Sequence, residues 1–290
     1  MSSLPLTPAA KADVLIEALP YIKRFAEKIV VVKYGGNVLS NTDESEALKG
    51  FAEDIVMMRS VGIRPVVVHG GGPQIAEMLT RLNITSEFRN GLRVTDAATL
   101  EVARMVLVGK VNRDIVAAIN IHGALAVGMS GEDANLLQVS ARDPELGFVG
   151  DVEHVNAEVL ERLLADEFIP VIATIGTDSE GQAYNINADT AAGAIAGAIG
   201  AEKLVYLTNI EGLRRNVADP STLISSIGVD ELQAMLDSGV LTEGMIPKIE
   251  SCIHAVRAGV GKAHILDGRS PHALLLEVFT QEGIGTEVTL

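Results

Sequence analysis

Two continuous runs of β-branched residues, each followed by a glycine-rich turn and a helical pattern, constrain the fold of this chain most. The runs are Ile29–Tyr34 (IVVVKY) and 65–69 (PVVVH), and the turns after them contain Gly35-Gly36 and Gly70-Gly71-Gly72. Apolar runs without alternation are typical of strands that are covered on both faces, as in parallel sheets. The pattern therefore predicts an α/β protein in which helices cover a mainly parallel sheet.

The same alternation of strands and helices continues along the chain. Further strands are predicted at 124–129, Ile169–Ala173, 184–187, Lys203–Thr208 and 261–266, with a hairpin in 136–155. Helices are predicted at Glu44–Ser60, from Pro73, at 95–120 with Thr95 as N-cap, at Glu158–Ala165, at 188–200 and at 245–258. Asn90-Gly91 is a hairpin-turn signal between two short segments.

An amphipathic helix is predicted before the first strand, over 11–25, with Pro20 ending or kinking it. Its apolar stripe packs either on its own domain or on another subunit. We expect three parts: an N-terminal interaction helix (1–26), a larger lobe (27–200) and a smaller lobe (201–290).

Composition excludes several classes of function. The 290 residues include 23 Lys and Arg against 38 Asp and Glu, a net charge of −15, which disfavours binding to nucleic acid or an anionic membrane. The single Cys252 excludes an internal disulfide and falls on an apolar helical stripe, so we expect an inert buried thiol. The histidines show no metal-ligand spacing, and no run is long enough to span a bilayer. We expect a soluble, cytoplasmic protein.

Two lysines stand in unusual places. Lys33 interrupts a buried strand pattern beside a glycine turn, and Lys248 follows Pro247 at the start of a helix, where the helix dipole disfavours a cation. A phosphate group at the carboxyl edge of the sheet would explain both positions, because glycine turns and helix N-termini bind anions. The alternatives are a strand-end lysine that reaches solvent and a solvated surface lysine.

A polar cluster, Asn185-Ile186-Asn187-Ala188-Asp189, leads into the Ala-rich helix. Asn185 and Asn187 share one face of the strand end, yet Asn187 and Asp189 are also what helix capping requires. Arg93, next to the Asn-Gly turn, is compatible with an exposed hairpin arginine or with a carboxylate clamp. For the cluster the residues alone favour helix capping, and for Arg93 they leave both alternatives open.

Taken together, the stretches VVVKYGGN, PVVVHGGGPQI, NGLRVTD, NINADTAA, KLVYLTNIEGL and GMIPKIE resemble the amino-acid kinase family, and within it the enzymes that phosphorylate N-acetyl-L-glutamate. The resemblance covers almost the whole chain and implies an open three-layer αβα sandwich. In it, 27–200 would be the acyl-amino-acid-binding lobe and 201–290 the nucleotide-binding lobe. It also implies transfer of a phosphoryl group from ATP to the side-chain carboxylate of N-acetyl-L-glutamate, in arginine biosynthesis. Mg²⁺ would be held mainly through the ATP phosphates, with no metal site of the protein's own.

The resemblance also implies a role for each matching residue. Lys33 and Lys248 would contact the transferring phosphoryl group, and Asp189 would organise the two lysines. Arg93 would hold the substrate carboxylate, with Asn185 contacting the substrate and Asn187 supporting the site. The phosphate-facing and turn-forming glycines would be Gly35, Gly36, Gly70, Gly71 and Gly72, and the nucleotide lobe would contribute Thr208 and Asn209.

Regulation and assembly are implied by the same resemblance. The N-terminal helix is similar to that of arginine-inhibited hexamers, which are trimers of dimers. Tyr21, His264, Glu277, Thr280 and Gly283 align with the arginine-binding segments. A PII-type signalling protein is a candidate partner, and the sequence leaves open whether one binds. Asn209 departs from the Asp usual in the family, so one negative charge is missing from the expected nucleotide contact.

Two alternatives stand beside this hypothesis. One is another acyl-phosphate-forming kinase that acts on glutamate, aspartate or carbamate. Arg93 within NGLRVTD argues against it. The other is a catalytically silent subunit that binds arginine. The joint presence of Lys33, Lys248 and Asp189 argues against it.

Overall fold

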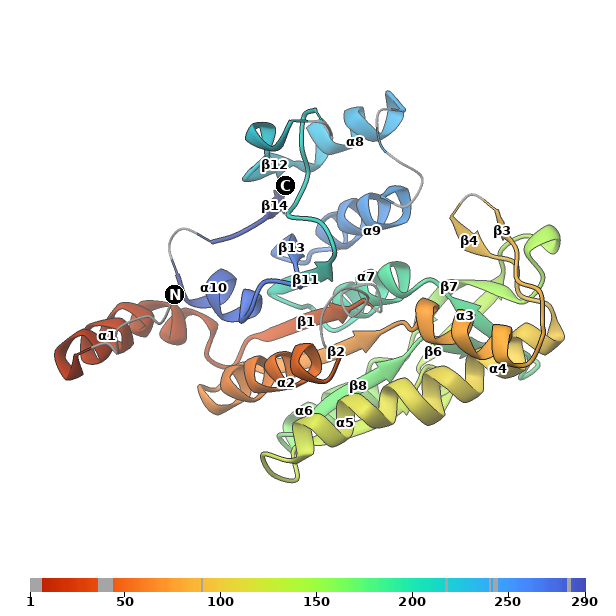
Figure 1. Ribbon diagram of the computed structural model, residues 1–290, viewed down its shortest axis with the longest axis horizontal. Helices are drawn as coiled ribbons and strands as arrows, with labels where there is room; N and C mark the ends of the chain where they lie inside the picture. The colour runs from red at the N-terminus through yellow and green to blue at the C-terminus, as the bar shows by residue number, and fades with distance from the viewer. Residues whose placement is uncertain are drawn as a thin grey trace.

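A central sheet with helices on both faces forms the body of the protein in a computed structural model (Figure 1). The structure describes residues 7–35, 44–89, 91–216, 219–239, 241, 245–280 and 283–290. In this part of the chain the sheet has eight strands, which follow in spatial order β12 (Ser226–Gly228), β14 (Thr286–Thr289), β13 (Lys262–Asp267), β11 (Lys203–Thr208), β1 (Ile29–Tyr34), β2 (Arg64–His69), β8 (Ile169–Ala173) and β5 (Ala126–Ser130). Within this sheet only the β13–β14 pair is antiparallel among the described pairings.

Two hydrophobic layers enclose the sheet, one on each face. One layer packs under α6 (Glu158–Ala165), α7 (Ala188–Ala198), α8 (Val229–Asp237) and α9 (Ile246–Arg257). The other packs under α2 (Glu44–Ser60), α3 (Gly72–Arg81), α4 (Ala97–Val106), α5 (Asn112–Asn120) and α10 (Ala273–Phe279). The predicted three-layer α/β sandwich is confirmed.

Smaller strands extend the body beside the sheet. β6 (Leu137–Ala141), β7 (Val149–Val155), β9 (Ile175–Thr177) and β10 (Ala183–Ile186) close into a small barrel. β6 and β7 are antiparallel, which confirms the predicted hairpin. β3 (Phe88–Arg89) and β4 (Leu92–Arg93) form the two-stranded ribbon predicted around the Asn-Gly turn; Asn90 itself lies outside the described residues.

The long helix predicted at 95–120 differs in two details. Its N-cap is Asp96, whose carboxylate accepts from Thr99 N at 2.7 Å, and not Thr95, whose hydroxyl donates to Arg93 O. A π-helical turn at Leu107–Val111 also divides the helix into α4 and α5. Such turns insert one residue into the helical register and occur often beside functional sites.

Helix α1 (Pro8–Phe25) projects from the edge of the sandwich (Figure 1). It continues through Pro20, so of the two effects predicted for Pro20, ending the helix is wrong and a kink stays a prediction. Phe25 is its buried residue, whereas Val14, Leu15 and Ile16 are more than half exposed. The helix thus contacts its own domain at its C-terminal end and leaves an apolar row exposed. None of the helices in the described ranges is long and apolar enough to cross a membrane.

Candidate functional site

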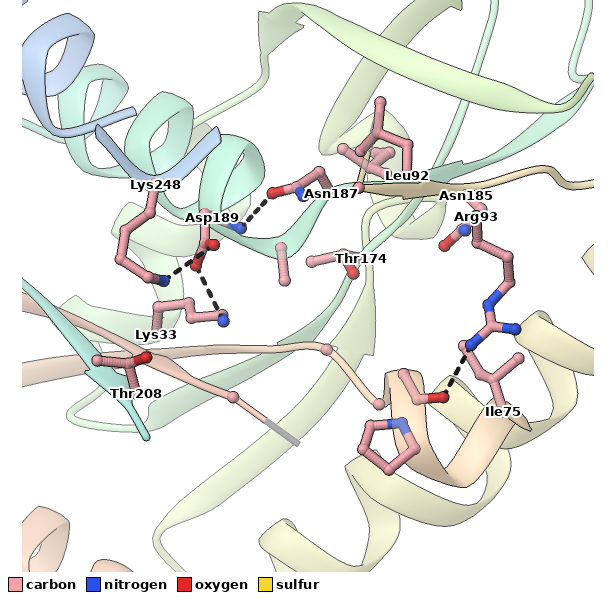
Figure 2. Close-up of a pocket in the computed structure, with 18 of the residues that line it drawn as sticks. Lys33, Ile75, Leu92, Arg93, Thr174, Asn185, Asn187, Asp189, Thr208 and Lys248 are labelled. Atoms are coloured by element: carbon pink, nitrogen blue, oxygen red, sulfur yellow. Dashed lines mark hydrogen bonds and ion pairs between the residues drawn. The ribbon is translucent and has the colours of Figure 1, made fainter. Parts of the chain in front are cut away.

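Lys33, Asp189 and Lys248 form a buried ion cluster at the carboxyl edge of the sheet (Figure 2). Lys33 Nζ lies 2.9 Å from Asp189 Oδ1, and Lys248 Nζ lies 2.9 Å from Oδ2 of the same carboxylate. The two ammonium groups therefore approach one carboxylate from different elements of the fold.

Local sequence explains how each member of the cluster is placed. Lys33 is near the end of β1, on the face that α7 and α9 cover. Asp189 is in the first turn of α7, whose N-cap Asn187 accepts from Asp189 N at 2.8 Å and Thr190 N at 3.2 Å. Lys248 is in the first turn of α9 and is 4% exposed, which rules out the solvated surface lysine. Asn187 thus caps the helix that presents Asp189.

The charges of the cluster depend on one another. Burial raises the pKa of the Asp189 carboxyl, but the ammonium groups of Lys248 and Lys33 outweigh burial and bring that pKa well below its usual range. Burial lowers the pKa of Lys33, while Asp189 opposes that shift. Asp189 is therefore ionised at neutral pH and is a very weak base, which fits a group that orients lysines.

Glycines keep the turn after β2 close to neighbouring elements. A Cβ on Gly71, the N-cap of α3, would stand 2.8 Å from Leu107 Cδ2 in the π-helical turn. A Cβ on Gly70 would stand 3.2 Å from Ala188 Cβ, at the start of α7. These close contacts bring the N-termini of α3 and α7 to the same edge of the sheet, where their N–H groups favour the binding of an anion. Gly36 of the other turn lies outside the described residues.

His69 supports this turn from within the core. Its Nε2 is 3.0 Å from Asn112 Nδ2, and its Nδ1 is 3.1 Å from Gly70 O. Because an amide nitrogen only donates, Nε2 is the acceptor and Nδ1 carries the hydrogen that it donates to Gly70 O. Burial lowers the pKa of His69 to about 4, so the ring is neutral at pH 7.

Protonation of His69 predicts a loss of stability in acid. The unfolded histidine binds a proton below about pH 6.5 and the folded one only below about pH 4, so stability falls as pH drops through this window. Between pH 7 and pH 4.5 we expect this group to lower the free energy of unfolding by about 2 kcal/mol. Urea unfolding at both pH values should show a smaller acid loss for His69→Asn than for the wild type. The exposed His154→Asn control should match the wild type, and an undiminished loss in His69→Asn would refute the assignment.

Arg93 lies on the opposite wall, on β4 (Figure 2). It is 8% exposed, donates to Gly72 O at 3.0 Å and to the Ser86 hydroxyl, and lies 4.6 Å from the centroid of the Phe88 ring. These contacts orient the guanidinium and rule out the exposed hairpin arginine. Asn185 donates to the Thr95 hydroxyl at 3.4 Å and lies on the same side of the site.

A cavity of about 660 Å³ joins the ion cluster to Arg93. This volume is in the range of small-molecule sites. Every predicted catalytic, substrate and nucleotide residue in the described part of the chain lines it: Lys33, Gly35, Gly70, Gly71, Gly72, Arg93, Asn185, Asn187, Asp189, Thr208, Asn209 and Lys248. Sequence reasoning missed Thr174, which follows β8, and the apolar residues Ile75, Phe88 and Leu92. The rule that ligands bind beyond the carboxyl ends of parallel strands could have indicated Thr174.

A second cavity, of about 810 Å³, lies between α1, β13 and α10. All five residues predicted for the effector site line it: Tyr21, His264, Glu277, Thr280 and Gly283. Lys203, which sequence reasoning missed, is buried there with its Nζ 2.9 Å from Glu277 Oε1, and His264 Nδ1 is 2.7 Å from the same oxygen. Burial raises the pKa of Glu277, but His264, Lys203 and the Ile284 N–H outweigh it and bring the pKa to about 2.

Two other expectations concern metals and thiols. Among the described residues, no group of three or more His, Cys, Asp or Glu is arranged to hold a metal ion. Cys252 is fully buried, and burial raises its pKa to about 12, which confirms the inert thiol.

The fold is a parallel α/β sandwich, and its basic, glycine-lined cavity lies at the carboxyl edge of the sheet. These features are typical of the class of proteins that bind phosphate groups. Residues 28–267 match the model of the amino acid kinase family, so this chain belongs to that family. It is 51% identical over 280 residues to an acetylglutamate kinase of Syntrophomonas wolfei, with 96% of each chain covered.

Solved structures show the same fold. N-acetylglutamate synthase from Neisseria gonorrhoeae, complexed with coenzyme A and N-acetyl-glutamate, superposes with a TM-score of 0.83 at 27% identity over 96% of this chain. The chain spans 63% of the length of that synthase. A second structure of the synthase, complexed with coenzyme A and L-arginine, superposes with a TM-score of 0.80 at 27% identity, covering 96% of this chain and 65% of the synthase.

Proposed function

We propose that this chain is an enzyme that transfers the γ-phosphoryl group of ATP to the side-chain carboxylate of N-acetyl-L-glutamate, the second step of arginine biosynthesis. The observation that carries the proposal is the Lys33–Asp189–Lys248 cluster, which faces Arg93 across one cavity. The acetylglutamate kinase relative, which matches nearly the whole chain at 51% identity, supports the choice of substrate.

The chemistry requires positioning and charge compensation. A carboxylate with an ordinary pKa near 4.3 is already ionised at pH 7, so it attacks the γ-phosphorus without a general base. A carboxylate oxygen forms a bond to phosphorus, the bond from phosphorus to the β,γ-bridging oxygen breaks, and ADP leaves with that electron pair. Lys33 and Lys248 compensate the charge on the transferring oxygens, and Arg93 holds the α-carboxylate at the far wall.

Asp189 acts on the lysines and does not act as a base. Both of its oxygens are in contact with ammonium groups, and its lowered pKa leaves it little affinity for a proton. It keeps two like charges close together before substrates arrive, which reduces the reorganisation that the reaction requires.

The nucleotide is placed by the second half of the chain. Thr208 ends β11 and Asn209 follows it, and both line the cavity together with Lys248. Mg²⁺ would be held mainly through the ATP phosphates. The bound ion supplies charge neutralisation on those phosphates. Asn209 has an amide where the family usually has the carboxylate of an Asp, so this side of the cavity has one negative charge fewer.

An ADP-release assay tests the substrate. With Mg-ATP we expect turnover with N-acetyl-L-glutamate and little with free glutamate, aspartate or carbamate, because Arg93 and the apolar wall at Ile75 and Leu92 suit an acylated amino acid. Preference for another acceptor would favour a different acyl-phosphate-forming kinase. Absence of turnover with all four would favour the silent arginine-binding subunit.

The second cavity is the proposed inhibitory site for L-arginine. It combines carboxylates for a guanidinium with cations for an α-carboxylate, among them Glu277, Glu287, Lys203 and Lys262. The Neisseria synthase structure that holds L-arginine superposes on this chain over 96% of its length, which supports the proposal.

The Glu277→Gln variant tests this site. The variant removes the negative charge of Glu277, which Lys203 and His264 contact and which is proposed to bind the arginine guanidinium. The arginine concentration for half-inhibition should rise by about tenfold or more, because a buried charged hydrogen bond is lost. ADP release measured against arginine, relative to the uninhibited rate of each variant, gives the result. The exposed Glu101→Gln on α4 is the control, and unchanged sensitivity in Glu277→Gln would place the inhibitor elsewhere.

Assembly follows from the apolar row on α1. Val14, Leu15, Ile16 and Leu19 are at least 40% exposed, which supports pairing of these helices between chains in a hexamer built as a trimer of dimers. Light scattering on the full chain tests this assembly. A PII-type partner, the cytoplasmic location and the division of the chain near residue 200 stay predictions.

A further inference from the structure

Tyr206 lies beneath the ion cluster, one strand away from Lys33. Strands β1 and β11 are parallel and pair Lys33 with Tyr206 in register, so the two side chains are on the same face of the sheet. Tyr206 is 0% exposed. It therefore has no access to a substrate in the cavity, and any effect it has on the reaction must pass through its neighbours.

Those neighbours are the groups proposed to act in phosphoryl transfer. Lys248 Nζ lies 5.0 Å from the centroid of the Tyr206 ring, within the range of a cation–π interaction. The Tyr206 hydroxyl is 2.5 Å from Ser251 Oγ, and the Ser251 hydroxyl donates to the main-chain oxygen of Asp189 at 2.6 Å. The Tyr206 hydroxyl is also 3.4 Å from that main-chain oxygen, but the serine contact is much shorter. The Ser251 hydrogen is therefore used in the bond to Asp189, and the Tyr206 hydroxyl is the donor to Ser251.

Helix packing supports the same arrangement. Ser251 follows Lys248 by three residues on α9, which puts both side chains on one face of the helix, toward Tyr206. On α7 the facing position is Gly193, where a Cβ would stand 2.3 Å from Ser251 Oγ. The absence of a side chain at Gly193 thus lets α9 approach α7 at the serine. Burial raises the pKa of Tyr206 well above 10, which keeps its hydroxyl a donor.

We propose that Tyr206 and Ser251 are positioning residues for phosphoryl transfer, with the ring supporting the Lys248 ammonium and the hydroxyl chain holding the first turn of α7. The inference rests on the roles proposed above for Lys248 and Asp189. A small displacement of either group would lengthen its contact with the reacting phosphoryl group, and misplacement by about 1 Å can cost about a hundredfold in rate.

Three variants separate the ring from the hydroxyl chain. Tyr206→Leu removes both and should lower kcat by about 10- to 100-fold. Tyr206→Phe keeps the ring, and Ser251→Ala breaks the chain, so each should lower kcat by about three- to tenfold, the size of one hydrogen bond. KM for ATP and for N-acetyl-L-glutamate should stay within about twofold in all three variants, because no residue that contacts substrate changes.

The matched control is Leu204→Ala, on the same strand and face, two residues from Tyr206 and 0% exposed. It should lower the melting temperature without lowering kcat of the folded enzyme. The double variant Tyr206→Phe/Ser251→Ala should be no slower than either single variant, because both act through one hydrogen-bonded chain.

The outcomes distinguish this inference from the proposed function. If Tyr206→Leu, Tyr206→Phe and Ser251→Ala all keep the kcat of Leu204→Ala, the inference is wrong while the enzyme activity stands. A fully additive double variant would refute the hydrogen-bonded chain. If the wild type does not phosphorylate N-acetyl-L-glutamate, the proposed function fails and this inference fails with it.

Discussion

The Lys248→Met variant should lose about a thousandfold in kcat for phosphorylation of N-acetyl-L-glutamate, the effect of removing a fixed positive group from a phosphoryl-transfer site. Lys248 Nζ is 2.9 Å from Asp189 and faces the cavity beside the nucleotide residues Thr208 and Asn209. The charge on the transferring oxygens grows in the transition state, so the loss should appear in kcat more than in KM.

Folding should survive this change, because Asp189 keeps its contact with Lys33 at 2.9 Å. Single-turnover kinetics with Mg-ATP and a melting curve measure the two effects separately. Lys28→Met, which replaces a half-exposed lysine just before β1, is the control and should behave as the wild type. A Lys248→Met enzyme within tenfold of the wild type would remove Lys248 from the reaction.

The Arg93→Lys variant should raise KM for N-acetyl-L-glutamate by about a hundredfold and leave KM for ATP within about twofold, because lysine cannot reproduce a two-pronged contact with a carboxylate. The guanidinium is oriented by Gly72 O, Ser86 and the Phe88 ring, which a flexible ammonium would not match. Steady-state kinetics with each substrate varied in turn give both constants.

Arg89→Lys is a close control, since Arg89 lies on the same two-stranded ribbon and its ion pair with Glu145 is exposed. It should leave both constants unchanged. If Arg93→Lys raises KM for ATP instead, the two ends of the cavity have been assigned in the wrong order.

Local patterns were enough to predict much of the fold. Strands β1, β2, β8, β11 and β13 were found because a buried parallel strand is a run of apolar residues whatever its neighbours are. Short elements were missed, among them β12, β14 and α10, because few residues carry too weak a pattern. The N-cap at Asp96 was missed because the adjacent Thr95 has a similar capping ability. The π-helical turn was also missed.

The sequence by itself determined which side chains were out of place. A lysine in an apolar strand and a lysine at the positive end of a helix are unfavourable positions that can be recognised from neighbouring residues alone. For Asp189 the sequence allowed two interpretations, because a first-turn carboxylate is also a good helix capper. Only the tertiary structure decided between them, by bringing Lys248, which is 59 residues away in the chain, to one of its oxygens.

The same limit applies to Tyr206, which nothing in the local sequence distinguishes from ordinary members of a buried strand. It also applies to Lys203, which at the first position of β11 resembles a strand-end lysine that reaches solvent. Their importance arises from partners on other elements, Ser251 and Lys248 for Tyr206 and Glu277 for Lys203. Such contacts depend on sheet register and helix packing, which are set by the whole core. The local sequence thus determined the strands, the turns and the misplaced charges, whereas the assembled core decided what each charge contacts.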